Sequence, residues 1–515
     1  MTKPKERRNQ NLFARFSRHF PDDLSKVLLT TPDGAKYSYA DALDESARIA
    51  LCLTDMGLKP GNRVTVQVDK SPAAVWLYLA CLRAGFVFHP LNTGYQFDEL
   101  VYFVDNAEPS LIVCDPAQEQ LFRELVKNKN CEVLTLDANG RGQLSEAAQE
   151  APPEFTIRVR KSTDLAVLLY SSGTTGIPKG AMLSHGNLAV NTTTLVDSWG
   201  FTPDDILLHG LPIYHAHGLF VGIGCTLMSG SSMMFLPRFD PDDVLAALPH
   251  STVMMGVPTF YTRLLKDERF DKYVCANMRV FISGSAPLSA PTFSEFEQRT
   301  GHRILERYGM TETSMNASNP LDGERRAGSV GPALPGVSLR VIDDEDNELP
   351  AGEIGNLQVQ GPNVFSGYWR MREKTAEEFT DDGYFRTGDQ ARIDADGYIS
   401  IVGRTKDLII SGGMNVYPRE VEAALDSLPE VAESAVIGAP HADFGEGVIA
   451  VVVAATDQDI SGTILIDQLR DRIAAYKLPK QVFTVSELPR NSMGKVQKNL
   501  LREAYVDTFA TSENS

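Results

Sequence analysis

One short segment limits the possible folds of this chain more than any other part of it. Residues 165–169 (LAVLL) form an apolar run typical of a buried strand, and residues 170–180 (YSSGTTGIPKG) follow directly. Glycines let backbone N–H groups approach an anion, hydroxyls add donors, and Lys179 adds charge. A G-x-x-x-x-G-K-[ST] loop is excluded because Ile177 and Pro178 separate Gly176 from Lys179. The segment predicts a strand followed by a phosphate-binding loop; a surface linker is disfavoured by the apolar strand before it.

Composition narrows the class of protein. The chain has 515 residues, too many for one core, so two or more domains are expected. Its net charge of −18 argues against nucleic-acid partners, which usually require a basic face. The longest apolar stretch is far too short for a bilayer, so no membrane partner is expected. Six cysteines without a C-x-x-C pair predict buried thiols in a reducing compartment, and we expect a cytoplasmic protein.

Helix and strand patterns alternate along the first 400 residues. Residues 73–82 read as a buried helix, and residues 86–90, 111–114 and 133–136 read as strands. This alternation predicts an α/β fold with mostly parallel sheets. Hairpin signals at 381–385 and 394–401 indicate a β-rich subdomain. A new pattern starts after residues 403–407, where Pro418 opens a helix with glutamates in its first turn, and it predicts a small α+β domain.

Four further clusters follow the loop in a fixed order. They are residues 281–287 (FISGSAP), 306–312 (ERYGMTE), 384–389 (YFRTGD) with 403–407 (GRTKD), and 488–498 (LPRNSMGKVQK). Each is weak alone, but together they resemble the adenylate-forming acyl-/aryl-CoA synthetase superfamily over nearly the whole chain. The one departure in the loop is Ser171, where the family usually has threonine, and it keeps a hydroxyl.

The resemblance implies a two-step reaction. A carboxylate is a poor electrophile, so the family first joins it to the α-phosphate of ATP, releasing pyrophosphate, and a thiol then displaces AMP. The implied cofactors are ATP, Mg²⁺ and coenzyme A. The implied domains are an AMP-binding domain at 1–403, a hinge at 404–407 that includes Lys406, and a mobile domain at 408–515, in which Gly413 lines the pantetheine tunnel.

The resemblance also implies roles for single residues. Residues 171–179 wrap the β- and γ-phosphates, and Asp389 accepts hydrogen bonds from the ribose. Thr174 and Glu312 lie near Mg²⁺, an ion that prefers hard oxygen ligands. Lys495 bridges the ribose and the reacting oxygens, and His215 lies where the acyl group and the thiol meet. The full expected nucleotide set is Ser171, Ser172, Gly173, Thr175, Gly176, Lys179, Ser285, Ala286, Pro287, Arg307, Tyr308, Gly309, Met310, Thr311, Asp389 and Arg404.

Two features of the sequence narrow the choice of the acid substrate. Arg263 is expected on a helix after the strand at 252–256, beside the acyl pocket, where a dicarboxylic acid needs a cation for its second carboxylate. Ser283 is expected to add a hydrogen bond to the same group. Residues 212–220 and 256–263 also resemble those of bacterial malonyl-CoA synthetases. We therefore expect malonate as substrate, with methylmalonate second and free CoA as acceptor.

Other functions remain open at this point. One is another short-chain or aryl acyl-CoA synthetase, and another is a stand-alone adenylation module that loads a carrier protein. A non-catalytic nucleotide-binding relative is disfavoured because Thr174, Glu312, Asp389 and Lys495 are all present. Acetylation would remove the charge of Lys495, so a lysine acetyltransferase and deacetylase are further expected partners.

Overall fold

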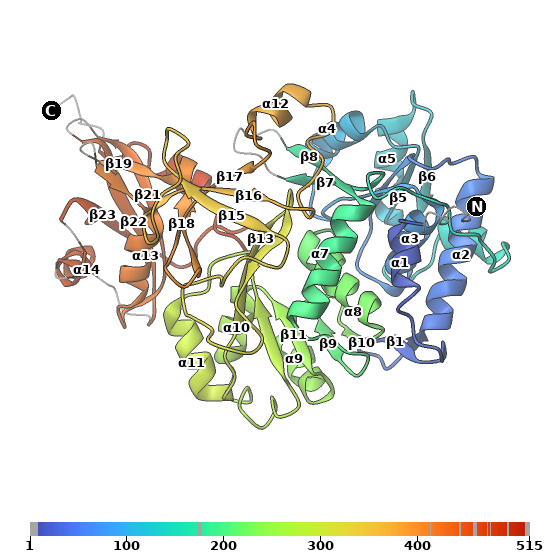
Figure 1. The fold of residues 1–515 in the computed structure, drawn as a ribbon, viewed down its shortest axis with the longest axis horizontal. Coiled ribbons are helices and arrows are strands. Elements are labelled where there is room, and N and C mark those ends of the chain that lie inside the picture. The colour runs from blue at the N-terminus through green and yellow to red at the C-terminus, as the bar shows by residue number, and fades with distance from the viewer. Residues whose placement is uncertain are drawn as a thin grey trace, which may run out of the picture.

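The chain folds into a large N-terminal part and a smaller C-terminal part (Figure 1). The computed structural model describes residues 9–171, 178–411, 414–441, 444–456, 461–470, 472–473, 475–491 and 494–509. Over these ranges, none of the helices combines the length and apolar character that a membrane span requires. Three sheets build the large part, and a fourth sheet builds the small part.

The first sheet carries the segment that opened the sequence argument. Its strand order is β6-β5-β3-β4-β7-β8, and all neighbours are parallel except the last pair. Helix α3 (Pro72–Ala84) starts at the capping hydroxyl of Ser71 and ends at Gly85, whose φ is +74°. The strands are β3 (Arg63–Gln67), β4 (Val87–Pro90), β5 (Leu111–Cys114), β6 (Glu132–Thr135), β7 (Leu165–Ser171) and β8 (Lys179–Ser184). The predicted helix and strands of this region are confirmed.

The second sheet has eight strands in the order β14-β13-β12-β11-β9-β10-β1-β2. The six middle strands are parallel, so their carboxyl ends share one edge. The strands are β1 (Val27–Thr30), β2 (Lys36–Ser38), β9 (Ile206–His209), β10 (Ser232–Phe235), β11 (Val253–Gly256), β12 (Val280–Ser283), β13 (Leu305–Met310) and β14 (Ser314–Ser318).

Helices and short turns connect and cover these two sheets. They are α1 (Leu12–Phe16), α2 (Tyr39–Asp55), α4 (Phe97–Ala107), η1 (Pro116–Gln118), α5 (Glu119–Val126), α6 (Gln143–Gln149), α7 (His185–Ser198), η2 (His217–Ile223), α8 (Gly224–Ser229), α9 (Pro241–Ala247), η3 (Leu248–His250), α10 (Pro258–Leu265) and α11 (Ala290–Thr300). Of these, η2 is a π-helix, a form that often occurs at functional sites.

The third sheet is the predicted β-rich region, and it is antiparallel throughout. It consists of β15 (Ser338–Ile342), β16 (Gly355–Gln360), β17 (Phe385–Ile393) and β18 (Ile399–Arg404), with α12 (Arg372–Glu377) before β17. The signal at 394–401 is the β17–β18 hairpin. The signal at 381–385 is a tight turn that closes on a bridge between Phe379 and Phe385, before the strand rather than between two long strands.

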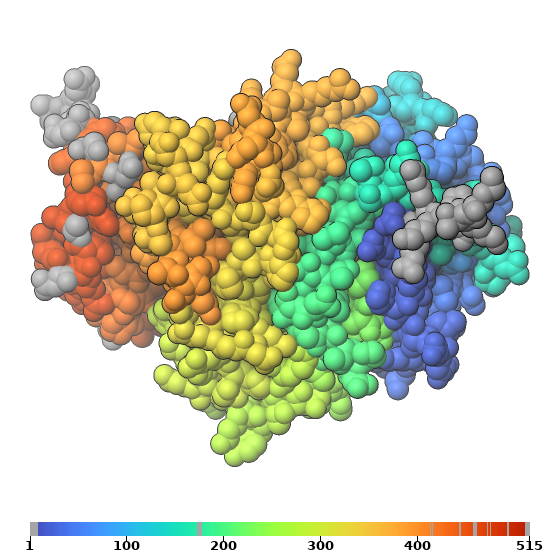
Figure 2. Space-filling view, viewed as in Figure 1, coloured from blue at the N-terminus to red at the C-terminus, as the bar shows by residue number. Residues whose placement is uncertain are grey.

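The C-terminal part has its own sheet and its own apolar clusters. Its elements are η4 (Thr405–Asp407), β19 (Ile409–Ser411), β20 (Met414–Val416), α13 (Pro418–Asp426), β21 (Val431–His441), β22 (Gly445–Ala454), α14 (Gly462–Leu469), η5 (Ala475–Lys477), β23 (Gln481–Val485) and α15 (Lys498–Ala504). The hydrophobic clusters divide between Ile401 and Ile409. Figure 2 shows this orange to red part beside the yellow and orange strands of the third sheet.

These observations confirm the predicted fold class: α/β layers with mostly parallel sheets, a β-rich sheet and a small C-terminal α+β domain. The boundaries at 403 and 408 and the hinge remain predictions. The six cysteines are free, and five are buried as expected, whereas Cys131 is partly exposed.

Candidate active site

Several predicted site residues come together at the carboxyl edge of the second sheet. His215 and His217 follow β9, Ser283 and Ser285 lie at the end of β12, and Arg307 lies on β13. In open α/β sheets, ligands bind outside the carboxyl ends of the parallel strands. The strand order therefore collects these side chains, which are far apart in sequence, at the place where such a fold binds its ligand.

Arg307 places a buried cation at this edge. The residue is 3% exposed, and its Nε and Nη2 have no hydrogen-bond partner among the described residues. A Cβ on Gly284 would lie 2.4 Å from Arg307 Cζ, so glycine is needed to leave room for the guanidinium. Burial lowers the pKa of Arg307 to about 10, and the Tyr261 phenol opposes this change. An unpaired buried charge is costly, which indicates that the site expects an anion.

Three more side chains at this edge carry a buried polar atom without a partner among the described residues. These atoms, within the described ranges, are Nε2 of His215, Nε2 of His217 and Oγ of Ser283. His217 Nδ1 lies 3.3 Å from Ser285 Oγ, and Ser285 has a left-handed φ of +72°. Burial lowers the pKa of His215 to about 4; burial and the nearby Arg307 charge lower that of His217. Both imidazoles are therefore neutral at pH 7 and can offer one donor each.

Tyr308, next to Arg307 on β13, belongs to a paired set. Its hydroxyl donates to Asp389 Oδ2 at 2.5 Å, and Arg404 Nε lies 2.8 Å from Asp389 Oδ1. Asp389 raises the pKa of Arg404, which keeps that guanidinium charged. Asp389 is buried on β17 and Arg404 ends β18, so the third sheet brings this set to β13.

Lys495 reaches this set from the C-terminal domain. Burial lowers its pKa, nearby Arg404 and Lys406 lower it further, and Asp389 and Glu312 oppose them. The Lys495 side chain is exposed, although charged groups from both domains lie near its ammonium. A Cβ on Gly494, where φ is +72°, would lie 3.0 Å from Thr259 Oγ1, so the Lys495 loop touches the start of α10. The structure thus brings Lys495 near Asp389, Arg404 and Glu312, and its role in adenylation remains a prediction.

Glu312 is held by two hydroxyls. Its Oε1 accepts hydrogen bonds from Ser171 Oγ at 2.7 Å and from the Tyr368 hydroxyl at 3.1 Å. The side chain is buried, and both of these donors contact the same oxygen of a carboxylate, a hard ligand that suits Mg²⁺. Thr174, the other predicted magnesium contact, lies outside the described residues, as do Ser172, Gly173, Thr175, Gly176 and the tunnel residue Gly413.

Lys179, the lysine that ends the loop segment, is buried rather than free. Its Nζ lies 3.3 Å from Glu378 Oε1 and 4.6 Å from the centre of the Tyr368 ring. Tyr368 therefore contacts both Glu312 and Lys179. The sequence argument missed Tyr368, Glu378 and Tyr261, because a tyrosine or a charge run carries no sequence signal that distinguishes a site from a core or a surface.

Arg263 lies on α10, the helix that follows β11, as expected, and its contact with the acid remains a prediction. Its side chain is exposed. The buried cation at this edge is Arg307, which the sequence argument assigned to the nucleotide. Lys406 is exposed in η4. The remaining predicted nucleotide contacts occupy the turns after β12 and in β13–β14: Ala286, Pro287, Gly309, Met310 and Thr311.

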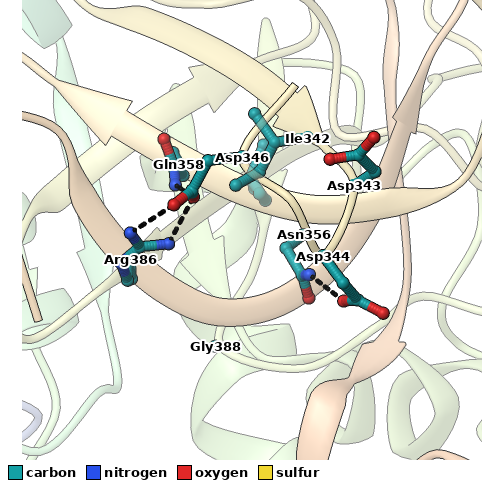
Figure 3. A pocket seen from close by; sticks show the side chains of 9 residues that line it. Ile342, Asp343, Asp344, Asp346, Asn356, Gln358, Arg386 and Gly388 are labelled. Atoms are coloured by element: carbon teal, nitrogen blue, oxygen red, sulfur yellow. Dashed lines mark hydrogen bonds and ion pairs between the residues drawn. The ribbon is translucent and has the colours of Figure 1, made fainter. Parts of the chain in front are cut away.

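A separate cavity of about 230 Å³ lies between β15, β16 and β17 (Figure 3). Its acidic side chains are paired within it: Asp346 contacts Arg386 at 2.7 Å, and Asn356 donates to Asp344 at 3.1 Å. Gly388 lines it, next to Asp389, but the unpartnered groups of the strand edge do not. We therefore place the active site at the strand edge and not in this cavity.

Comparisons with known proteins agree with this geometry. The AMP-binding enzyme family matches residues 13–369, and the AMP-binding enzyme C-terminal domain matches residues 420–495. A malonate–CoA ligase of Arabidopsis thaliana is 33% identical over 92% of this chain and 85% of its own length. A feruloyl-CoA synthase of Amycolatopsis sp is 36% identical over 92% of this chain and 94% of its own.

Solved structures are similar over more of the chain. The crystal structure of ATP-bound MatB from Rhodopseudomonas palustris is 54% identical and covers 97% of this chain and 100% of its own, with a TM-score of 0.95. The apo form of the same protein gives a TM-score of 0.85 over the same shares. The present structure thus resembles the ATP-bound arrangement more than the apo arrangement.

The matched families, the fold and the strand-edge site lead to one assignment. The chain belongs to the AMP-binding enzyme family, as an acyl-CoA ligase similar to malonate–CoA ligases.

Proposed function

We propose that this ligase adenylates malonate with ATP, releases pyrophosphate, and transfers the malonyl group to CoA in the cytoplasm. That AMP-binding CoA ligases use ATP and CoA follows from the family. The choice of malonate rests on one observation, the buried guanidinium of Arg307, whose Nε and Nη2 have no partner among the described residues. Methylmalonate carries the same second carboxylate and is proposed as a poorer substrate.

The geometry of Arg307 supports a dicarboxylic acid. Its free atoms, Nε and Nη2, lie on one edge of the guanidinium, the edge that can donate two parallel hydrogen bonds to a carboxylate. A fatty or aryl acid would leave this cation buried and unpaired. A site built around a charged group rejects an analogue that lacks the matching group far more strongly than an apolar pocket rejects a longer chain.

Ser283 and His217 are proposed to complete the acid pocket. Both are buried, and both have a polar atom without a partner among the described residues. Each can donate to a carboxylate oxygen that Arg307 does not satisfy. Arg263, exposed on α10, is assigned a smaller role at the rim.

The paired set around Asp389 is proposed to hold the nucleotide. Asp389 accepts from the ribose hydroxyls, and Arg404 and Tyr308 fix its carboxylate in place. Lys495 stabilises negative charge on the reacting carboxylate and α-phosphate oxygens in the adenylating arrangement. Its acetylation would remove that charge, which we propose as a control point.

The phosphate segment is proposed to receive the pyrophosphate end of ATP. Lys179 and the loop at 171–179 would contact the β- and γ-phosphates, and Glu312 would hold Mg²⁺. The oxygens there fit that ion, because Ser171 and Tyr368 orient the Glu312 carboxylate and supply no nitrogen or sulfur ligand. When bound, the ion supplies charge stabilisation for the departing pyrophosphate.

Residues 404–407 are proposed as the hinge between the two steps. The C-terminal domain contributes Lys495 to the adenylation site, so it has to move before a thiol can reach the adenylate. The similarity to the ATP-bound arrangement supports the view that the present structure is the adenylating state.

An acid panel tests the proposal. Pyrophosphate release would be measured with ATP, CoA and malonate, methylmalonate, acetate, an unbranched fatty acid or ferulate. We expect the highest kcat/KM with malonate and malonyl-CoA as product. Best activity with ferulate or the fatty acid would reject malonate, and a thioester formed on a carrier protein but not on CoA would reject the acceptor.

A further inference from the structure

Glu378 neutralises the lysine of the phosphate segment before any ligand binds. Ser171 and Lys179 pair at the end of β7 and the start of β8, so the two residues flank the segment 172–178 in the sequence. Lys179 is 5% exposed, with its Nζ 3.3 Å from Glu378 Oε1. The cation proposed to meet pyrophosphate therefore already has a carboxylate counter-ion in an enclosed position.

Two adjacent glutamates on this segment have different surroundings. Glu378 follows α12, and its side chain is only 20% exposed between Lys179 and Lys374, the latter 3.2 Å away. Glu377 is 66% exposed and pairs with Lys374 at 3.0 Å, on the solvent side. The chain thus supplies a matched pair: one carboxylate that contacts the loop lysine, and one with the same charge that contacts a surface lysine.

A carboxylate beside a phosphate-binding lysine has a predictable electrostatic effect. It attracts the ammonium and fixes its position, but it also repels a phosphate anion that approaches the same ammonium. A ligase that splits ATP between the α- and β-phosphates must release pyrophosphate in every turnover, and product release often limits turnover. Full exposure of the Lys179 charge to pyrophosphate would slow that release.

We propose that Glu378 is a positioning residue that lowers the affinity of the active site for pyrophosphate by partly neutralising Lys179. This role rests on the proposed function of residues 171–179 as the pyrophosphate site. Tyr368 supports it, because its ring covers the Lys179 ammonium and its hydroxyl donates to Glu312, so the lysine has little freedom to turn away.

A purely structural role for Glu378 predicts the opposite sign. If the pair only held Lys179 in place, its loss would misplace the ammonium and weaken the binding of ATP and pyrophosphate together. If the carboxylate offsets the charge, its loss strengthens the binding of both. The sign of the change therefore separates the two roles, and Glu378→Gln keeps the size of the side chain.

The experiment compares the wild-type protein, Glu378→Gln and Glu377→Gln by calorimetric titration with magnesium pyrophosphate. We expect Glu378→Gln to bind pyrophosphate about five- to tenfold more tightly. Glu377→Gln should stay within about twofold of the wild type, because its charge is exposed and screened. Product inhibition by pyrophosphate against ATP should show the same order.

Unchanged or weaker pyrophosphate binding in Glu378→Gln overturns the proposal, as does an equal effect in Glu377→Gln. A wild-type protein that does not bind pyrophosphate overturns it as well. The titration needs no acid or turnover, so failure of the malonate assignment in the acid panel leaves its result interpretable. Thermal unfolding of both variants without ligand checks that folding is intact.

Discussion

Two neighbouring residues of β13 illustrate two ways of building an active site. Successive side chains of a strand point to opposite faces, so Arg307 and Tyr308 serve different surroundings. Tyr308 donates to Asp389, and Asp389 pairs with Arg404. Arg307 is more deeply buried than Tyr308, yet its Nε and Nη2 have no partner among the described residues.

This difference indicates what each face binds. The Tyr308 face is satisfied by its own protein contacts, so it can hold a neutral ribose without a cost to the ligand-free protein. The Arg307 face keeps a buried charge unpaired, which destabilises the ligand-free protein and favours an anion. In the proposed assignment, pairing within the protein marks the nucleotide side, and missing pairing marks the acid side.

The largest expected effect on the paired face belongs to Lys495. Lys495→Ala should lower the rate of adenylation about a hundredfold, or about 3 kcal/mol, because a donor to developing charge is lost. ATP–pyrophosphate exchange with malonate measures it. Transfer from preformed malonyl-AMP to CoA should remain within about tenfold of the wild type. An equal loss in both steps would show that Lys495 is not specific to adenylation.

Glu306 is an exception to the contrast between the paired Tyr308 face and the unpaired Arg307 face. It lies on the Tyr308 side of β13, but its Oε2 has no partner among the described residues. Burial raises its pKa to about 7 from 4.5, opposed by the Leu288 N–H and by Arg419 of α13. The folded state therefore holds the proton more tightly, so stability falls as pH rises from about 4.5 to 7. The free energy of unfolding falls by about 3 kcal/mol in total, and the fall is complete once the pH exceeds the pKa of the folded state.

Urea unfolding of the wild type and of Glu306→Gln between pH 5 and 8 measures this effect. As pH rises, the unfolding free energy of the wild type should fall relative to that of the variant, because the amide of Glu306→Gln does not titrate. Parallel pH profiles for the two proteins would show that Glu306 is ionised throughout and paired in solution.

Tyr308→Phe tests the paired face itself with a smaller effect. The variant loses one donor to Asp389, while Arg404 still holds the carboxylate, so we expect a KM for ATP raised about fivefold, near 1 kcal/mol. Tyr398→Phe is the matched control, because its hydroxyl donates to the Glu324 carbonyl at 2.7 Å at the surface. A loss as large as that of Lys495→Ala would mean that Asp389 depends on this one bond.

The smallest effect is expected at Arg263. Exposed substitutions usually change free energies by no more than about 0.5 kcal/mol, so Arg263→Ala should keep kcat/KM for malonate within about twofold. Lys266→Ala, exposed just after the same helix, is the control. A loss above about thirtyfold, specific to Arg263, would restore the assignment made from sequence and weaken that of Arg307.

The sequence predicted the fold class well because that class depends on local patterns, whereas the nucleotide contacts remain predictions. Residues 165–169 are apolar and lie before the glycine-rich segment, and the hairpin at 394–401 has its turn residues in place. The meeting of Asp389, Arg404 and Lys495 came from family resemblance, since no pattern links residues a hundred positions apart. The burial of single side chains could not be predicted, because nothing in the sequence shows that Arg307 is enclosed and Arg263 exposed.

The specificity ratio between malonate and propionate in the wild type and in Arg307→Met tests the central claim most directly. Propionate has a methyl group where malonate has its second carboxylate, so only the charge that Arg307 would bind is changed. We predict that the wild type prefers malonate in kcat/KM by at least about a hundredfold, and that the variant removes or inverts this preference. An Arg307→Met protein that loses activity with both acids equally, or keeps the malonate preference, would contradict the account.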